Sequence, residues 1–165
     1  MDFSFFRYVF PEVIVSNREI RDEIDMVRRC NYLLVQNLVS DVEVYRSQRS
    51  IGVLPGYQKY LGEVNAFREK HAGLLRGALF RSDSLYSCST DALYSAGHLA
   101  PDGSVVILAT LSHLDKCKAV FTVPGYVFDS ADFLGGGKAG KNGNIELKRN
   151  SVAFLRFIKD KRGRL

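Results

Sequence analysis

The stretch PGYQKYLGEVNAFREKHAGLLRGALF, residues 55–80, separates two halves of this sequence that carry different patterns. Within it, one set of residues recurs at steps of three and four: Tyr57, Tyr60, Leu61, Val64, Phe67, His71 and Leu74. This spacing predicts an amphipathic helix with one buried face. The charged residues fall mainly on the opposite face and are expected to be solvated: Lys59, Glu63, Arg68, Glu69 and Lys70. We expect Pro55 near the first turn and Gly73 at the C-cap.

The composition is that of ordinary globular protein. The chain has 165 residues, of which 46% are hydrophobic and 25% are charged, as in folded rather than disordered chains. No apolar run approaches the ~18 residues of a membrane span. The first residues lack the basic region and the small-residue cleavage site of a signal peptide. We therefore expect no membrane partner and a cytoplasmic polypeptide as written, with the compartment open if the chain is a piece of a longer one.

The cysteines and the basic residues indicate no metal, cofactor or nucleic-acid site. Cys30, Cys88 and Cys117 are widely spaced and form no CxxC pair, so buried reduced thiols are favoured over zinc ligands. The formal charge is +5, and four basic residues gather near the end: Lys159, Lys161, Arg162 and Arg164. Such a tail could touch an anionic partner, but a solvated terminus is the more common case. Because the positive charge is not interleaved with aromatic residues, we expect no nucleic-acid partner.

The first half reads as alternating strands and helices. Apolar density over residues 3–15 predicts a strand buried on both faces, which Pro11 ends near Phe10. Ser16 and Glu19 form a capping box that predicts a helix through about Leu38. Its expected buried face is Ile20, Ile24, Val27, Leu34 and Leu38. A short strand is predicted over 41–45, before the central helix. This βαβα pattern covers about a quarter of the ~250 residues of a (β/α)8 barrel.

The second half reads as short antiparallel strands. Residues 93–96, the turn Pro101-Asp102-Gly103 and residues 104–111 predict a hairpin. Further strands are predicted at 119–123, 126–128, 145–147 and 152–158, with a glycine-rich loop over 135–143. Spacings of roughly ten residues with turn signals are typical of an antiparallel sandwich or meander. The predicted fold class is therefore α+β: an incomplete βαβα, barrel-end segment followed by an antiparallel β-sandwich or meander.

Two motifs have simpler interpretations than the chemistry they first suggest. The segment GGGKAGKN, residues 135–142, matches the start of a phosphate-binding P-loop, but Asn142 stands where Ser or Thr should hold magnesium. The residues after Asn142 are typical of turn and strand, so no helix N-terminus faces a phosphate, and a hairpin loop is favoured. His71 falls on the apolar face of the central helix, where a satisfied core histidine is favoured over a catalyst.

Three carboxylates are the candidate site residues. Glu12 comes directly after a predicted buried strand, at the position where barrel enzymes place working groups. Asp41 and Glu43 occupy the corresponding zone of the second unit. Hydrolysis of a glycosidic bond requires such paired carboxylates, one as acid and one as base or nucleophile. We therefore take Glu12 as the catalytic candidate and Asp41 and Glu43 as substrate-binding candidates. The simpler alternative is that Glu12 caps the chain or pairs with Arg7 or Arg18.

The order of these segments is similar to that of a known family. The segments are, in order, FRYVFPE (residues 6–12), a helix, a short strand, LPGYQKYLGEVNAFREKHAGLLRGALFRSD (54–83) and NIELKRNSVAFLRF (144–157). Together they resemble the C-terminal part of barrel glycoside hydrolases with an antiparallel β-domain. The resemblance covers most of the chain. It implies that residues 1–80 are terminal βα units, 81–160 the β-domain and 161–165 a basic tail. It also implies a carbohydrate partner and no catalysis by this chain alone, because most of the barrel is missing.

Two functions are compatible with these patterns. The chain is either the C-terminal portion of a glycoside hydrolase or a self-contained α/β module that binds carbohydrate without catalysis. In the second case, Tyr94, Tyr126 and Phe128 are candidates for stacking on the ligand. In the first case, the strand over 3–15 and the inner face of the helix over 17–38 lack partners. Their exposed apolar surface then leads us to expect self-association.

Overall fold

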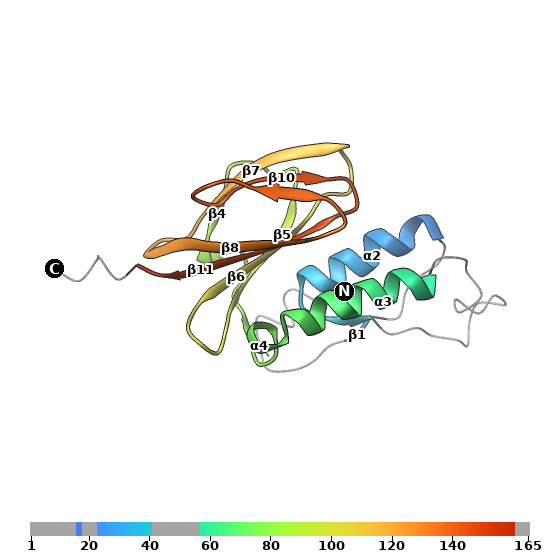
Figure 1. Ribbon diagram of the computed structural model, residues 1–165, viewed down its shortest axis with the longest axis horizontal. Coiled ribbons are helices and arrows are strands. Elements are labelled where there is room, and N and C mark those ends of the chain that lie inside the picture. The colour runs from blue at the N-terminus through green and yellow to red at the C-terminus, as the bar shows by residue number, and fades with distance from the viewer. Residues whose placement is uncertain (1–15, 18–22, 41–56, 161–165) are drawn as a thin grey trace.

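The computed structural model describes residues 16–17, 23–40 and 57–160. Within them, two antiparallel β-sheets stack face to face, and the two longer helices, α2 (Glu23–Val35) and α3 (Tyr57–Lys70), cover the outer face of the larger sheet (Figure 1). The short helix α4 spans Ala72–Leu75, and a 3₁₀ turn spans Ser82–Leu85. The fold class is therefore α+β, and the described strands close no barrel.

The strands are mostly short, and all but the first two follow one another after helix α4. The first two are β1 (Ser16–Asn17) and β2 (Val39–Ser40). The others are β3 (Leu79–Phe80), β4 (Ser87–Cys88), β5 (Tyr94–Leu99), β6 (Val105–Thr110), β7 (Lys116–Thr122), β8 (Tyr126–Leu134), β9 (Gly137–Ala139), β10 (Asn144–Lys148) and β11 (Val152–Lys159). The predicted hairpin is confirmed, because β5 and β6 pair in antiparallel fashion across the turn at Gly103, which has a φ of +79°.

The larger sheet has the order β3-β5-β6-β11-β8, and all its neighbours are antiparallel. Strand β11 lies in its interior, and its successive side chains face opposite layers, as the twofold period of a strand requires. Val152 and Phe154 join the core beneath the helices, whereas Ala153, Leu155 and Phe157 join the core between the sheets. Both faces of this strand are therefore buried.

The smaller sheet has the order β4-β7-β10-β9 and covers the other face of β11 and β6. Its inner residues alternate with exposed ones: Ala119 and Phe121 on β7 and Ile145 and Leu147 on β10 are buried. This alternation is typical of an antiparallel sheet with one face packed and one solvated. The outer face of the smaller sheet lies on the side of the molecule away from the helices (Figure 1).

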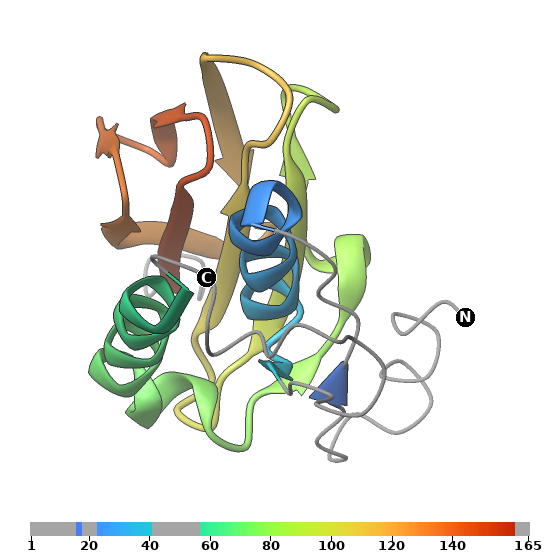
Figure 2. The same ribbon diagram turned by 90° about the vertical axis from the view of Figure 1, so that its right-hand side faces the viewer.

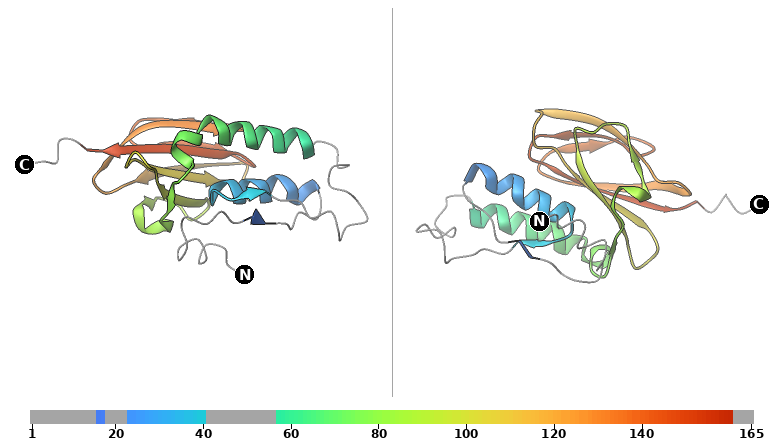
Figure 3. Two further views of the ribbon diagram at one scale, coloured as in Figure 1. Left: turned by 90° about the horizontal axis from the view of Figure 1, so that it is seen from below. Right: turned by 180° about the vertical axis from the view of Figure 1, so that it is seen from behind.

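Helices α2 and α3 lie side by side, run in the same direction and pack on the larger sheet (Figures 1, 2 and 3). Leu34 of α2, Val64 and Phe67 of α3 and Phe154 of β11 share one core. This finding corrects the expectation that the inner face of the first helix lacks partners. Leu34 is 0% exposed because this chain's own helix and sheet cover it.

The first half contains one strand–helix–strand unit. β1 and β2 pair in parallel, with Ser16 opposite Val39 and Asn17 opposite Ser40, and α2 connects them. Parallel neighbours need such a crossover, usually a helix. Ser16 was predicted to cap a helix, and this prediction is wrong, because Ser16 is paired in a strand instead. The predicted strands over 3–15 and 41–45 lie outside the described residues.

The central helix ends earlier than predicted. α3 stops at Lys70, His71 interrupts it, and the chain continues as the single turn α4. Gly73 lies inside α4 and is therefore not the C-cap. Gly77 has a φ of +74° and comes just after this turn, so it is the glycine whose left-handed backbone ends the helical segment. The apolar face is confirmed, because Val64 is 1% and Phe67 is 7% exposed.

Buried polar side chains link the helices to the sheets. Asn31 Nδ2 donates a hydrogen bond to the Asn150 carbonyl at 3.0 Å, and the Tyr60 hydroxyl donates to Asn31 Oδ1 at 2.5 Å. Burial raises the pKa of the Tyr60 hydroxyl. Arg68, predicted to be solvated, instead donates hydrogen bonds to Asn37 Oδ1 at 3.1 Å and to the Leu38 carbonyl.

Two strands differ from their predicted extent. β8 runs to Leu134 rather than stopping at Phe128, and its pairing with β11 shifts register between Arg156 and Phe157, where Asp129 has no opposite residue. β9 forms within the glycine-rich segment that was predicted to be a loop. The interpretation that this segment is not a P-loop is confirmed, because strand β10 comes after it where a helix would be needed.

Candidate functional site

The predicted site residues Glu12, Asp41 and Glu43 all lie outside the described residues. The structure describes only the strands next to them. Asn17 and Ser40 are opposite one another in the parallel pair β1 and β2, so the carboxyl ends of both strands lie at the same edge. Asp41 is the residue directly after that edge in the sequence. Glu12 instead precedes β1, so its predicted place after a strand depends on residues that are not described.

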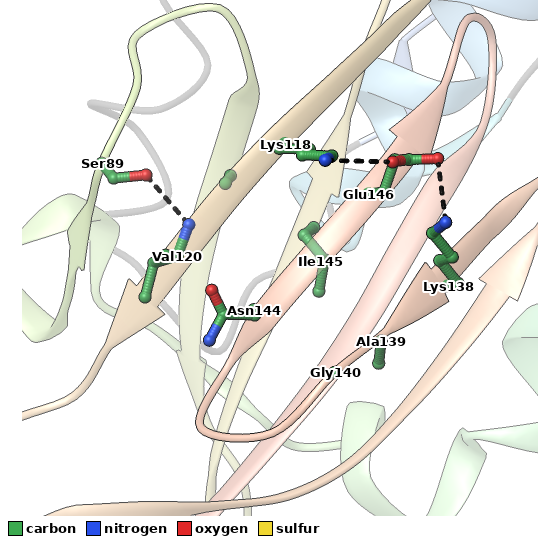
Figure 4. A pocket seen from close by; sticks show the side chains of 10 residues that line it. Ser89, Lys118, Val120, Lys138, Ala139, Gly140, Asn144, Ile145 and Glu146 are labelled. Atoms are coloured by element: carbon green, nitrogen blue, oxygen red, sulfur yellow. Dashed lines mark hydrogen bonds and ion pairs between the residues drawn. The ribbon is translucent and has the colours of Figure 1, made fainter.

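A groove lies on the outer face of the smaller sheet (Figure 4). Its volume is about 440 Å³. Residues of β7, β9 and β10 line it, together with Ser89 after β4: Lys118, Ala119, Val120, Lys138, Ala139, Gly140, Asn144, Ile145 and Glu146. The groove is therefore built on three hydrogen-bonded strands, which fix the relative positions of its side chains.

Glu146 lies at the centre of the charged part of this groove. Its carboxylate is 3.5 Å from Lys138 Nζ and 4.0 Å from Lys118 Nζ, and the register places all three residues in one cross-strand row (Figure 4). The Glu146 side chain is only 20% exposed, whereas Lys118 is 82% and Lys138 is 74% exposed. The carboxylate is thus held between two ammonium groups that remain open to solvent.

The other end of the groove offers neutral hydrogen-bonding groups beside an exposed apolar side chain. Val120 is 37% exposed, and its amide donates to Ser89 Oγ at 2.9 Å, which fixes the loop after β4 against β7. Opposite Val120, the Asn144 amide group donates to the Lys141 carbonyl at 2.7 Å. The groove can therefore present ammonium, carboxylate, amide and hydroxyl groups to one ligand.

The glycines beside the groove serve packing rather than phosphate binding. A Cβ on Gly137 would lie 2.3 Å from the Phe133 ring, and one on Gly143 would lie 2.3 Å from the Phe121 carbonyl oxygen. Gly143 also has a φ of +75°, which L-residues rarely adopt. These close approaches explain the glycine-rich sequence without a bound nucleotide.

A second polar cluster lies where α3 meets β8. Asp132 Oδ2 is 2.7 Å from Lys70 Nζ and 2.8 Å from His71 Nε2, and the His71 ring stacks on Phe154 at a centroid distance of 3.8 Å. Burial opposes ionisation of Asp132, but the hydrogen bonds from Lys70, His71 and the Phe133 amide outweigh it and lower the pKa of the carboxyl. The interpretation of His71 as a satisfied core histidine is confirmed, and the cluster holds the helix on the sheet.

A third cluster surrounds Arg156 on β11. Its guanidinium is 2.8 Å from Asp102 and 3.4 Å from Asp129, beside a shallow pocket of about 160 Å³. Hydrogen bonds from Ser104 lower the pKa of the Asp102 carboxyl, and Arg156 adds to this effect. Since both carboxylates already contact the same guanidinium, the cluster links the β5–β6 turn to the bulge in β8.

The predicted stacking residues are packed within the molecule. The Tyr94 ring lies 4.3 Å from that of Tyr32, and its hydroxyl accepts a hydrogen bond from Gln36. Tyr126 and Phe128 pack against the core between the sheets. None of the three predicted residues lines the groove. The groove itself was missed. The alternating lysines in the sequence KCKAV, residues 116–120, could have indicated only that one face of this strand is basic and solvated.

Other classes of site receive no support from the described residues. Among residues 16–17, 23–40 and 57–160, no group of three or more His, Cys, Asp or Glu side chains could hold a metal ion, and no helix is long and apolar enough to cross a membrane. The three cysteines are free thiols, and burial raises the pKa of Cys88.

No protein-family model matches the sequence, and no curated protein is significantly similar to it.

Proposed function

We propose that this chain is the C-terminal portion of a carbohydrate-active, glycoside hydrolase-like protein, in which the β-sandwich supports a catalytic barrel. The observation that carries the proposal is the unit β1-α2-β2, in which two parallel strands are joined by a helix. Helix α3 then lies beside α2 in the same direction, and both pack on the sandwich. Repeated βα units with parallel helices are the elements of a barrel wall.

Under this proposal, the working groups lie at the carboxyl ends of the parallel strands. Asp41 comes directly after β2 in the sequence, and Asn17 and Ser40 are the last residues of the two parallel strands. Hydrolysis of a glycosidic bond uses two carboxyl groups on either side of the bond, about 5–9.5 Å apart depending on the stereochemistry. Asp41 and Glu43 are proposed to bind the sugar, and Glu12 is the proposed catalytic carboxylate. The remaining βα units would supply the other partners, so the chain alone is expected to be inactive.

The test measures hydrolysis and association of the 165-residue chain. We expect no release of chromophore from aryl glycosides. We also expect self-association in size-exclusion chromatography with light scattering, because barrel strands that lack the rest of their barrel would expose backbone and apolar groups. A monodisperse monomer with one cooperative melting transition would contradict the proposal. Turnover that disappears in Glu12→Gln would contradict the inactivity of the isolated chain while supporting the role of Glu12.

A second candidate function is a self-contained carbohydrate-binding module without catalysis. The specific observation in its favour is that the sandwich covers the inner face of α2, since Leu34 and Val35 are completely buried in the core that the helices share with the larger sheet. The groove on the smaller sheet supplies a surface that needs no barrel. The two functions are separated by the chromatography above: the module predicts a stable monomer, and the barrel portion predicts association.

A further inference from the structure

The outer face of the smaller sheet concentrates positive charge. Its strands carry four exposed lysines, which we call the lysine face: Lys116, Lys118, Lys138 and Lys148. Glu146 is the one acidic side chain on these strands and contacts only two of the four. The lysine face therefore keeps a net positive charge after its internal ion pairs are formed.

The other two lysines form a like-charged pair. Lys116 and Lys148 are directly opposite in the antiparallel register of β7 and β10, and neither forms an ion pair with another described residue. Like charges directly opposite one another destabilise a sheet. A ligand that carries negative charges at intervals would relieve this repulsion and contact the row of Lys118 and Lys138 next to it.

The neutral polar groups of the groove indicate which kind of anionic polymer fits it. Asn144, Ser89 and the Glu146 carboxylate provide donors and acceptors of the kind that sugar hydroxyls use, whereas no aromatic ring lines the groove. Single-stranded nucleic acids are usually held by aromatic stacking platforms, which this surface lacks. The combination favours a polymer that has both hydroxyl groups and regularly spaced anionic groups.

We propose that the lysine face and its groove bind an acidic polysaccharide, such as a chain of uronic-acid sugars. This inference rests on the proposed carbohydrate function and assigns it a substrate class. The two helices cover the opposite side of the sandwich, so the face lies two layers away from them (Figure 1). In this proposal it is a surface site that holds the polymer.

The test uses the 165-residue chain and polygalacturonate as the probe. Binding is measured by affinity electrophoresis in native gels that contain polygalacturonate, with neutral dextran in parallel gels. The variant Lys116→Gln/Lys148→Gln removes the like-charged pair and should weaken binding about tenfold, because two exposed charge contacts are lost. The matched control Lys59→Gln/Lys159→Gln changes net charge equally but lies on α3 and the end of β11, and it should change binding by less than about twofold.

Thermal unfolding shows whether weaker binding by the lysine variant comes from the lost charges or from a loss of folded protein. The lysine variant should melt at or above the wild-type temperature without ligand, since repulsion is removed, and polygalacturonate should raise the wild-type melting temperature more than that of the variant. Equal weakening in both double variants, or polyuridylate bound more tightly than polygalacturonate, would overturn the inference. Such a result would leave the proposed hydrolase function untouched, because the chromatography and glycoside assays do not involve this face.

Discussion

The substitution Leu34→Ala tests whether the helices and the sandwich fold as one unit. Leu34 is 0% exposed and belongs to the core shared by α2, α3 and β11. Truncating such a residue costs about 3 kcal/mol, because its methyl groups lose their contacts and a cavity remains. For a chain of this length, 1 kcal/mol shifts the melting temperature by about 2–4 °C, so we expect a decrease of about 9 °C.

The assay is thermal unfolding monitored by circular dichroism at a helix-sensitive wavelength and by tyrosine fluorescence. If the shared core couples the layers, both signals should move together in Leu34→Ala. The matched control is Asn65→Ala, at an exposed position on α3, which should move neither transition by more than about 1 °C. The reasoning is refuted if the helical signal melts early while the fluorescence transition stays at the wild-type temperature.

Three further substitutions test individual contacts. Gly137→Ala should destabilise the chain by about 1–3 kcal/mol in urea unfolding, because its Cβ would meet the Phe133 ring at 2.3 Å, whereas Gly140→Ala, whose Cβ has 3.6 Å of clearance, should not. Tyr60→Phe leaves Asn31 Oδ1 without its donor and should cost about 1.5 kcal/mol, with Tyr126→Phe near zero as the control. Asp132→Asn should cost about 1 kcal/mol near pH 7. Because the folded pKa of Asp132 is lowered, its stabilisation is complete above the unfolded pKa of about 3.9 and is lost as pH falls through the folded value. The wild-type and Asp132→Asn stabilities should therefore converge in acid, and a difference that stays constant down to about pH 2 would contradict this.

The sequence predicts elements well where local chemistry and tertiary packing agree. The turn at Gly103 and the spacing of Val64 and Phe67 lead to the correct hairpin and helix face. Strand β8 is missed beyond Phe128, because Asp129, Ser130 and Asp132 interrupt its apolar alternation and are held by ion pairs and a bulge instead. Ser16 is misassigned because its cap-like spacing competes with a partner strand far along the chain.

The groove could not be predicted from the sequence, because it depends on the register between distant strands. Lys118 and Lys138 become neighbours only when β7 and β9 both pair with β10. Nothing in their sequence positions reveals that both face Glu146. The predicted carboxylates Glu12, Asp41 and Glu43 depend instead on the short parallel strands, of which the structure describes two residues each.

Strand β11 comes last among the described strands and yet occupies the interior of the larger sheet, between β6 and β8. During synthesis, β6 and β8 are made before β11, the strand that pairs with both of them. Until β11 is made, each of these two strands has an unpaired hydrogen-bonding edge. Such edges can pair with other chains while they wait. The ribosome must therefore release the final strand before this sandwich can close. A chain that terminates before Val152 would leave β6 with an open edge and β8 without a partner in the larger sheet, where chaperones or other chains could bind.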